Sequence, residues 1–151
     1  MGFRPAGLPH DTSTPYRPQT NGVAERAVRR VKEGTSCALS QSGLTEAWWG
    51  EAMKCYCFLR NTVDLLVGDE TSWRKRFGSD FEGPLMPFGC DITYKPISPE
   101  DVQRLHQFGE KVLPGIFFGY VQRHGGGWTG DLLVMDWIDL QEADRVSLTF
   151  T

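Results

Sequence analysis

Nowhere in its 151 residues does the chain contain an apolar run of about 18 residues, the length that a membrane-spanning helix requires. The first ten residues, MGFRPAGLPH, also lack the charged and apolar parts of a secretory signal peptide. With 40% hydrophobic residues, the chain still has enough apolar material for a buried core. The sequence therefore predicts a globular, intracellular protein without a membrane partner, built from one ordinary domain or two small ones.

Cysteine and histidine are scarce. The four cysteines include no C-x-x-C pair, and the three histidines are scattered, so neither a disulfide framework nor a zinc site is indicated. Cys55 and Cys57 fall within a predicted helix, where residues two apart point about 200° away from each other. We expect these two cysteines to be reduced and to serve in packing.

An excess of positive charge is missing as well, since the formal net charge is −3. Proteins that bind nucleic acids usually carry excess positive charge, so the overall balance argues against that class. The charge is unevenly distributed, however, because the stretch from Arg17 to Lys32 holds five basic residues against one acidic residue. We therefore expect an anionic partner to bind locally at this stretch.

Helical patterns occupy the first half of the chain. Two prolines and the Asn21-Gly22 pair predict a loop over residues 15–22. Small and apolar residues then recur at steps of three and four, which predicts a helix from about residue 22 to residue 40 that ends at Gly43.

Two further helices are predicted before residue 80. The first begins at Thr45, a good N-cap residue, and runs to about Thr62. Its apolar face includes Trp48, Trp49 and Met53 and is heavy enough to require a large packing surface. The second is short, covers residues 71–77 and is closed by a glycine.

The pattern changes to strands in the second half. The segment SDFEGPLMP, residues 79–87, is typical of a linker. The runs PFGCDITYKP, VLPGIFFGYV and GDLLVMDWID are rich in β-branched and aromatic residues, and the glycine-rich RHGGGWTG between the last two predicts a hairpin connection. We expect three or more strands in a small β-barrel or meander, followed by an uninformative tail at residues 141–151.

A carboxylate and several cations share one side of the first predicted helix. Glu25, Arg29 and Lys32 follow the i, i+4, i+7 spacing of a single face, with Arg26 and Arg30 beside them. One interpretation is an ordinary Glu-Arg pair on a solvated helix, worth about 0.2–0.5 kcal/mol. The other is a carboxylate that holds a divalent metal while the cations bind phosphates. The spacing alone favours the first interpretation, the ordinary Glu-Arg pair.

A motif around this carboxylate changes the balance. The segment GLPHDTSTPYRPQTNGVAER, residues 7–26, resembles a motif of retroviral and copia-type retrotransposon integrases that reads G-[IL]-x-H-x-x-[ST]-x-P-Y-x-P-Q-x-N-G-x-A-E-R. The resemblance implies that Glu25 is the third carboxylate of an Asp, Asp, Glu triad that binds two magnesium ions on a ribonuclease H-like fold. It also implies a set of DNA contacts in the loop and on the helix: Tyr16, Arg17, Gln19, Asn21, Arg26, Arg29 and Lys32.

The resemblance extends along most of the chain. LTEAWWGEAMKCYCFLRN and TSWRKRFG are similar to helical motifs that follow the triad glutamate in this family, and PFGCDITYKP with LPGIFFGY is similar to a pair of motifs just beyond the copia-type catalytic core. The implied fold is α/β: a truncated ribonuclease H-like integrase core, mainly its C-terminal helices, followed by a small SH3-like β-barrel. The implied boundaries are 1–81 for the core portion, 82–140 for the barrel and 141–151 for the tail.

The chain departs from the family in one decisive respect. Both triad Asp residues precede the glutamate, at a spacing that here falls before Met1, and Asp11 matches neither of them. The chain thus resembles a polynucleotidyl transferase but lacks two of the three carboxylates, so Mg²⁺ is expected in the complete enzyme and not to bind this chain tightly. Without the family's sheet to cover, the tryptophan-rich helix face predicts a chain that is marginally stable, self-associates, or packs against its own barrel.

Three hypotheses for function remain open. The first is the C-terminal part of a retrotransposon integrase, DNA-binding and inactive alone, acting in the nucleus within its Pol polyprotein context. The second is a non-enzymatic nucleic-acid or protein binding module derived from a transposable element. The third is a decayed fragment without function. Magnesium-dependent binding that needs Glu25 discriminates the first from the second.

Overall fold

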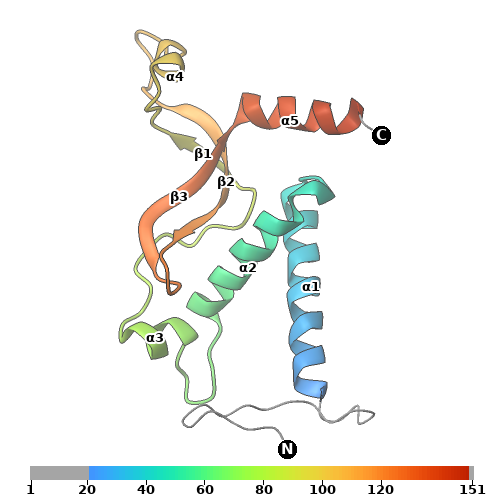
Figure 1. The fold of residues 1–151 in the computed structure, drawn as a ribbon. Coiled ribbons are helices and arrows are strands. Elements are labelled where there is room, and N and C mark those ends of the chain that lie inside the picture. Colours follow the sequence, from blue (N-terminus) through green and yellow to red (C-terminus); the bar gives the residue numbers. More distant parts are fainter. Residues whose placement is uncertain (1–20, 150–151) are drawn as a thin grey trace, which may run out of the picture.

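The computed structural model describes residues 21–149, and for residues 144–149 it describes the backbone alone. Helices flank a three-stranded antiparallel sheet with the strand order β1-β2-β3 (Figure 1). The elements in chain order are α1 (Gly22–Ser42), the 3₁₀ turn η2 (Glu46–Trp48), α2 (Trp49–Val63), α3 (Ser72–Phe77), β1 (Asp91–Tyr94), α4 (Pro99–Gln103), β2 (Leu113–Gln122), β3 (Trp128–Asp136) and α5 (Trp137–Thr149).

The predicted helix boundaries are confirmed where glycine sets them. Helix α1 ends at Gly43, which adopts a left-handed φ of 73° and donates its N–H to the Leu39 carbonyl. Helix α3 starts after Thr71, whose hydroxyl accepts the Arg74 N–H, and stops at Gly78 with a φ of 81°. Both ends satisfy backbone groups that a helix terminus leaves without intrahelical partners.

Helix α2 begins later than its sequence signal predicts. The chain turns at Thr45, but the Thr45 side chain makes no capping hydrogen bond, and the first turn is the 3₁₀ turn η2. Helix α2 then lies across the sheet, with Ala52, Cys55 and Phe58 buried. Burial raises the pKa of the Cys55 thiol to about 12, so this cysteine stays protonated and serves in packing, as predicted.

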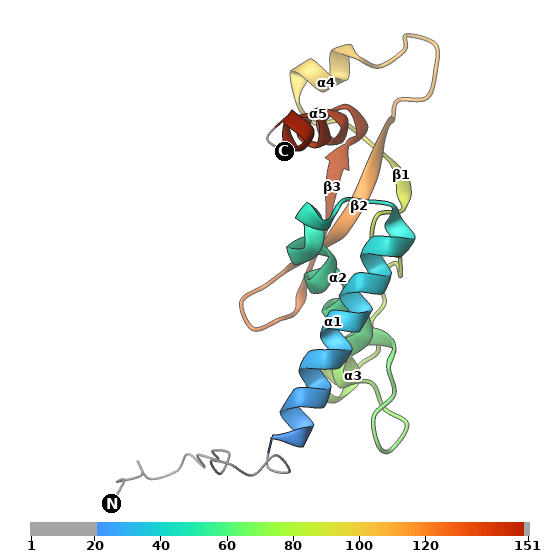
Figure 2. The ribbon, with the colours of Figure 1, turned by 90° about the vertical axis from the view of Figure 1, so that its right-hand side faces the viewer.

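Helices α1 and α2 cross closely because one of them carries a glycine at the crossing (Figure 2). The ring of Tyr56 in α2 covers Gly34 in α1, and a methyl group at position 34 would stand 2.1 Å from the Tyr56 Cζ atom. No real Cβ contact is that short, so the ring occupies the space that any other residue would need. Gly34 is thus required by the helix crossing and not by backbone conformation.

The variant Gly34→Ala is expected to lower the free energy of unfolding by about 1–3 kcal/mol, because the ring must move to admit the methyl group. In a Tyr56→Ala background the same change should instead stabilise the protein, by up to about 1 kcal/mol, since alanine is the better helix former. Urea unfolding of the four proteins in this double-mutant cycle measures both values. A destabilisation that persists in the Tyr56→Ala background would contradict the assigned contact.

The sheet is an antiparallel meander. Strand β1 pairs with β2 from Asp91↔Ile116 to Tyr94↔Leu113, and β2 pairs with β3 from Gly115↔Asp136 to Gln122↔Trp128. The predicted glycine-rich hairpin joins β2 and β3, where Arg123 and Gly127 form a backbone hydrogen bond. A small β-barrel or a meander was predicted for these strands. Among the described residues the sheet is open, so the meander is the form observed. Helix α5 starts before residue 140 and continues through most of residues 141–151, the predicted tail.

Strand β2 provides the centre of the core. Phe117 is fully buried, and Phe58 of α2 stacks on Tyr120 with ring centroids 4.3 Å apart. Trp48 packs edge to face on Phe118 at 5.0 Å. The apolar face of α2 therefore packs against the chain's own sheet, although Trp49 remains 59% exposed. The sequence left three possibilities for this face: marginal stability, self-association, or packing against the chain's own strands. The structure shows the third, packing against its own strands.

None of the helices in the described part of the chain combines the length and the apolar character needed to cross a membrane.

Candidate nucleic-acid interface

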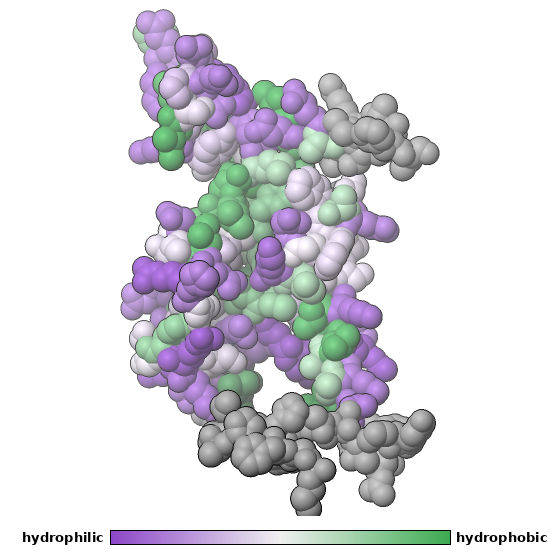
Figure 3. Space-filling model, in the orientation of Figure 1, coloured by the Kyte–Doolittle hydropathy of each residue, from purple (hydrophilic) through white to green (hydrophobic). Residues whose placement is uncertain are grey.

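The first half of helix α1 extends beyond the core and exposes its side chains to solvent. Glu25, Arg26, Arg29 and Lys32 are all exposed, and Thr35 is the one buried residue that the helix contains. The apolar stripe of the same half is also uncovered, with Val28 54% exposed. In Figure 3 this apolar strip lies between polar surfaces along the lower part of α1. The half helix is thus a free surface of the described structure.

Four of the predicted site residues come together on this surface. Asn21 accepts the Glu25 N–H through its backbone carbonyl at 2.9 Å and so lies at the start of the helix. Asn21, Glu25, Arg29 and Lys32 then line one shallow groove along α1, to which Glu33 adds a second carboxylate. The guanidinium of Arg26 lies beside Gly22 instead, outside that groove. The other three predicted DNA contacts, Tyr16, Arg17 and Gln19, lie outside the described residues.

The Glu-Arg pair on a solvated helix face does not form. Within residues 21–143, where side chains are described, Glu25 has no ion pair and Arg29 and Lys32 have none. Exposed Glu-Arg pairs are worth little in water, so solvent competes well with them. Within the described residues, therefore, no carboxylate occupies the hydrogen-bond donors of these two cations.

A metal does not fit this surface by itself. Among the residues that the structure describes, no three His, Cys, Asp or Glu side chains are grouped closely enough to hold a metal ion. The groove offers two exposed carboxylates, Glu25 and Glu33, whereas magnesium sites that perform phosphoryl transfer use several oxygen ligands held close together. The described residues therefore support phosphate binding and do not by themselves make a magnesium site.

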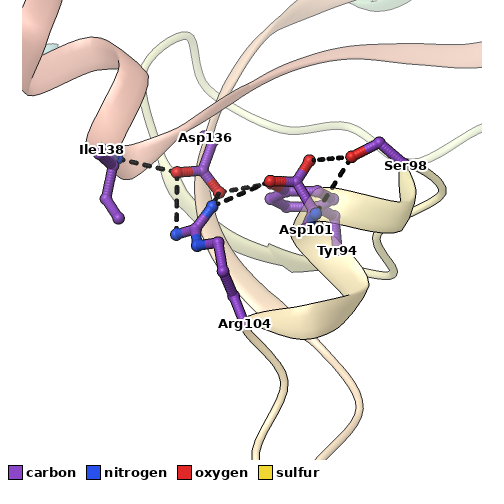
Figure 4. A network of polar contacts seen from close by, with 6 residues as sticks. All are labelled: Tyr94, Ser98, Asp101, Arg104, Asp136 and Ile138. Carbon is purple, nitrogen blue, oxygen red and sulfur yellow. Dashed lines mark hydrogen bonds and ion pairs between the residues drawn. The ribbon is translucent and has the colours of Figure 1, made fainter.

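A polar network that was not predicted lies where strand β3 meets helix α5, beside helix α4 (Figure 4). Asp136, 7% exposed, accepts four hydrogen bonds. The Tyr94 hydroxyl donates at 2.5 Å, the Arg104 guanidinium at 3.0 and 3.3 Å, and the Ile138 N–H at 2.9 Å. Arg104 also pairs with Asp101 at 3.2 Å. The network ties helix α4 to the end of β3.

The pKa values in this network indicate a structural role. Burial acts to raise the pKa of Asp136, but the hydrogen bonds from Tyr94, Arg104 and Ile138 outweigh it and hold that pKa below its ordinary value. Burial and the adjacent carboxylate raise the pKa of Tyr94 to about 12. Asp136 is thus charged and Tyr94 neutral at pH 7, with every donor aimed at the carboxylate satisfied.

Comparison with known proteins finds relatives among transposon polyproteins. Over 118 residues, 76% of this chain, the sequence is 33% identical to the retrovirus-related Pol polyprotein from transposon TNT 1-94 of Nicotiana tabacum. It is 30% and 29% identical to those from transposons RE1 and RE2 of Arabidopsis thaliana, over 78% and 76% of the chain. The chain spans about 8% of the length of each relative. No protein-family model and no solved structure matches it.

Proposed function

Starting from the homology of this chain to retrovirus-related Pol polyproteins of plant transposons, we propose that it is a piece of the integrase region of such a polyprotein and that it binds DNA through helix α1. The observation that carries the proposal is the groove on α1, where Arg29 and Lys32 are exposed and unpaired within the described residues. Arginine and lysine on one helix face suit the phosphate backbone of a duplex.

The catalytic part of the proposal belongs to the complete protein. There, Glu25 would join two aspartates to bind Mg²⁺, and DNA strand transfer in the nucleus would be the activity. In this chain the residues of α1 hold DNA and position the carboxylate beside it. The exposed apolar strip of α1, with Val23 and Val28, would be covered by neighbouring polyprotein or by self-association.

Replacing both groove cations should weaken DNA binding. The double variant Arg29→Gln/Lys32→Gln is expected to bind a duplex oligonucleotide about tenfold less tightly and to reduce the slope of log K against log salt by about 2, because two phosphate contacts are lost. Fluorescence anisotropy over a series of salt concentrations measures both quantities. The double variant Lys54→Gln/Lys95→Gln removes the same net charge at exposed positions elsewhere and serves as the control. Equal losses in the two double variants would point to general electrostatics and against the groove.

Glu25 tests the second candidate, a non-enzymatic binding module. Without magnesium, Glu25→Gln should strengthen DNA binding slightly, since a negative charge is removed from the groove. With magnesium, wild-type binding should improve more than binding by Glu25→Gln, since a Mg²⁺ ion that the described residues of α1 do not hold alone can bridge Glu25 and a DNA phosphate. If the wild type and Glu25→Gln bind DNA identically both with and without magnesium, the non-enzymatic binding module is favoured.

A further inference from the structure

A second hollow on the molecule lies between helices α1 and α2 and is distinct from the groove on α1. It has a volume of about 370 Å³ and combines Arg30 of α1 with Arg60 and Asn61 of α2 and with Ser72 at the start of α3. Arg30 follows Arg29 by one residue, so the two side chains leave the helix about 100° apart. The hollow and the groove therefore lie on neighbouring sides of the same helix.

The charges in the hollow favour an anion. Arg60 uses its Nε atom to pair with Asp64 at 3.1 Å, and its two terminal nitrogens have no partner among the described residues. Arg30 has no carboxylate partner within the described residues either. Asp64 also lines the hollow, but its side chain is 59% exposed and hence well hydrated. Two guanidinium groups facing one hydrated carboxylate leave the hollow net positive.

The donors of the hollow match the oxygens of a phosphate. A guanidinium presents its N–H groups as a planar fork that fits two phosphate oxygens at once. The Asn61 amide and the Ser72 hydroxyl add two uncharged donors, and within the described residues no hydrogen bond occupies either side chain. A volume of about 370 Å³ also leaves room for the sugars on either side of a phosphate.

We propose that this hollow is a second phosphate site, in which Arg30 and Arg60 together bind a backbone phosphate of the nucleic-acid strand that crosses helix α1. The proposal rests on the proposed function, because the strand is the one held by Arg29 and Lys32. A polynucleotide is favoured over a free phosphate ion because the groove and the hollow adjoin along one helix, so successive phosphates of one strand can occupy both.

The test compares Arg30→Gln, Arg60→Gln and the double variant with Lys54→Gln, which removes a positive charge from another side of α2. Each single variant should reduce the salt slope of duplex binding by about 1 and should weaken binding more than Lys54→Gln does. The double variant should lose little more than either single variant, since both arginines hold the same phosphate. Thermal unfolding of each variant checks that the fold is retained.

A direct measurement separates this proposal from the proposed function. In NMR titrations with a thymidine dinucleotide, the Arg30 and Arg60 Nε–H signals should shift at lower ligand concentration than the Arg29 Nε–H signal. This result would support the hollow even if Arg29→Gln/Lys32→Gln bound DNA normally. Inorganic phosphate that shifts the same signals as strongly as the dinucleotide would overturn the assignment to a polynucleotide. The proposal that Arg30 and Arg60 share one phosphate would be overturned by either of two results. One is that the arginine variants bind DNA as well as Lys54→Gln does, and the other is that the losses of the two single variants add up in the double variant.

Discussion

Replacing Phe117 by alanine is expected to lower the free energy of unfolding by about 3–5 kcal/mol, a large fraction of the roughly 5–15 kcal/mol that stabilises a typical domain. Phe117 is fully buried and lies at the middle of β2, where its ring packs at 5.2 Å against Tyr120. Its removal leaves a cavity under helix α2 that the surrounding aromatic rings cannot fill without leaving their own contacts.

Phe108 provides the matched control for this variant. It is the same residue type but 88% exposed, so Phe108→Ala should change stability by less than about 0.5 kcal/mol. Urea unfolding followed by tryptophan fluorescence measures both variants. Similar stabilities of Phe117→Ala and the wild type would contradict a core centred on β2.

The second large effect is expected at Asp136. In Asp136→Asn the side chain keeps its shape, but one acceptor oxygen becomes an NH₂ donor. Because each carboxylate oxygen accepts two hydrogen bonds, the new donor faces two other donors whichever way the amide turns. We expect a loss of about 2–3 kcal/mol at pH 7. The exposed Asp139, three residues on, is the control; it lies in the first turn of α5, so Asp139→Asn should cost less than about 1 kcal/mol.

The Asp136 effect should depend on pH in a defined direction. Because the pKa of Asp136 is lower in the folded protein than in the unfolded chain, its charge stabilises the fold above the unfolded value of about 4. That contribution disappears as the pH falls through the lower, folded value. The stability difference between wild type and Asp136→Asn should therefore shrink below about pH 4. A difference that stays constant between pH 7 and pH 3 would show that the charge of Asp136 is irrelevant.

The local elements of this fold were predictable because short-range chemistry sets them. Gly43 and Gly78 end helices by adopting left-handed conformations, and the glycines after Arg123 turn the hairpin. The basic face of α1 follows from spacing alone. These features depend on residues within about one turn of each other, which a sequence displays directly.

The missed features depend on contacts between distant segments. Arg30 and Arg60 line the same hollow only because helices α1 and α2 cross. That crossing in turn depends on the contact between Gly34 and the Tyr56 ring. Asp136 likewise pairs with Arg104, which lies at the C-terminal end of helix α4 and is 32 residues away in the sequence. A glycine inside a helical pattern was the available signal for a close crossing, but nothing local identified its partner. Helix α5 was missed because its residues show no strong apolar periodicity.

The dependence of helix α2 on strand β2 has a consequence for the chain during its synthesis. The ribosome completes α2 well before β2, since helix α3, strand β1 and helix α4 lie between them in the sequence. Synthesis proceeds at about 5–20 residues per second, so the apolar face of α2 remains without its packing partner β2 for several seconds. During that interval Phe58 and its neighbours have no strand to pack against, so the nascent chain exposes an apolar helix face until β2 is made.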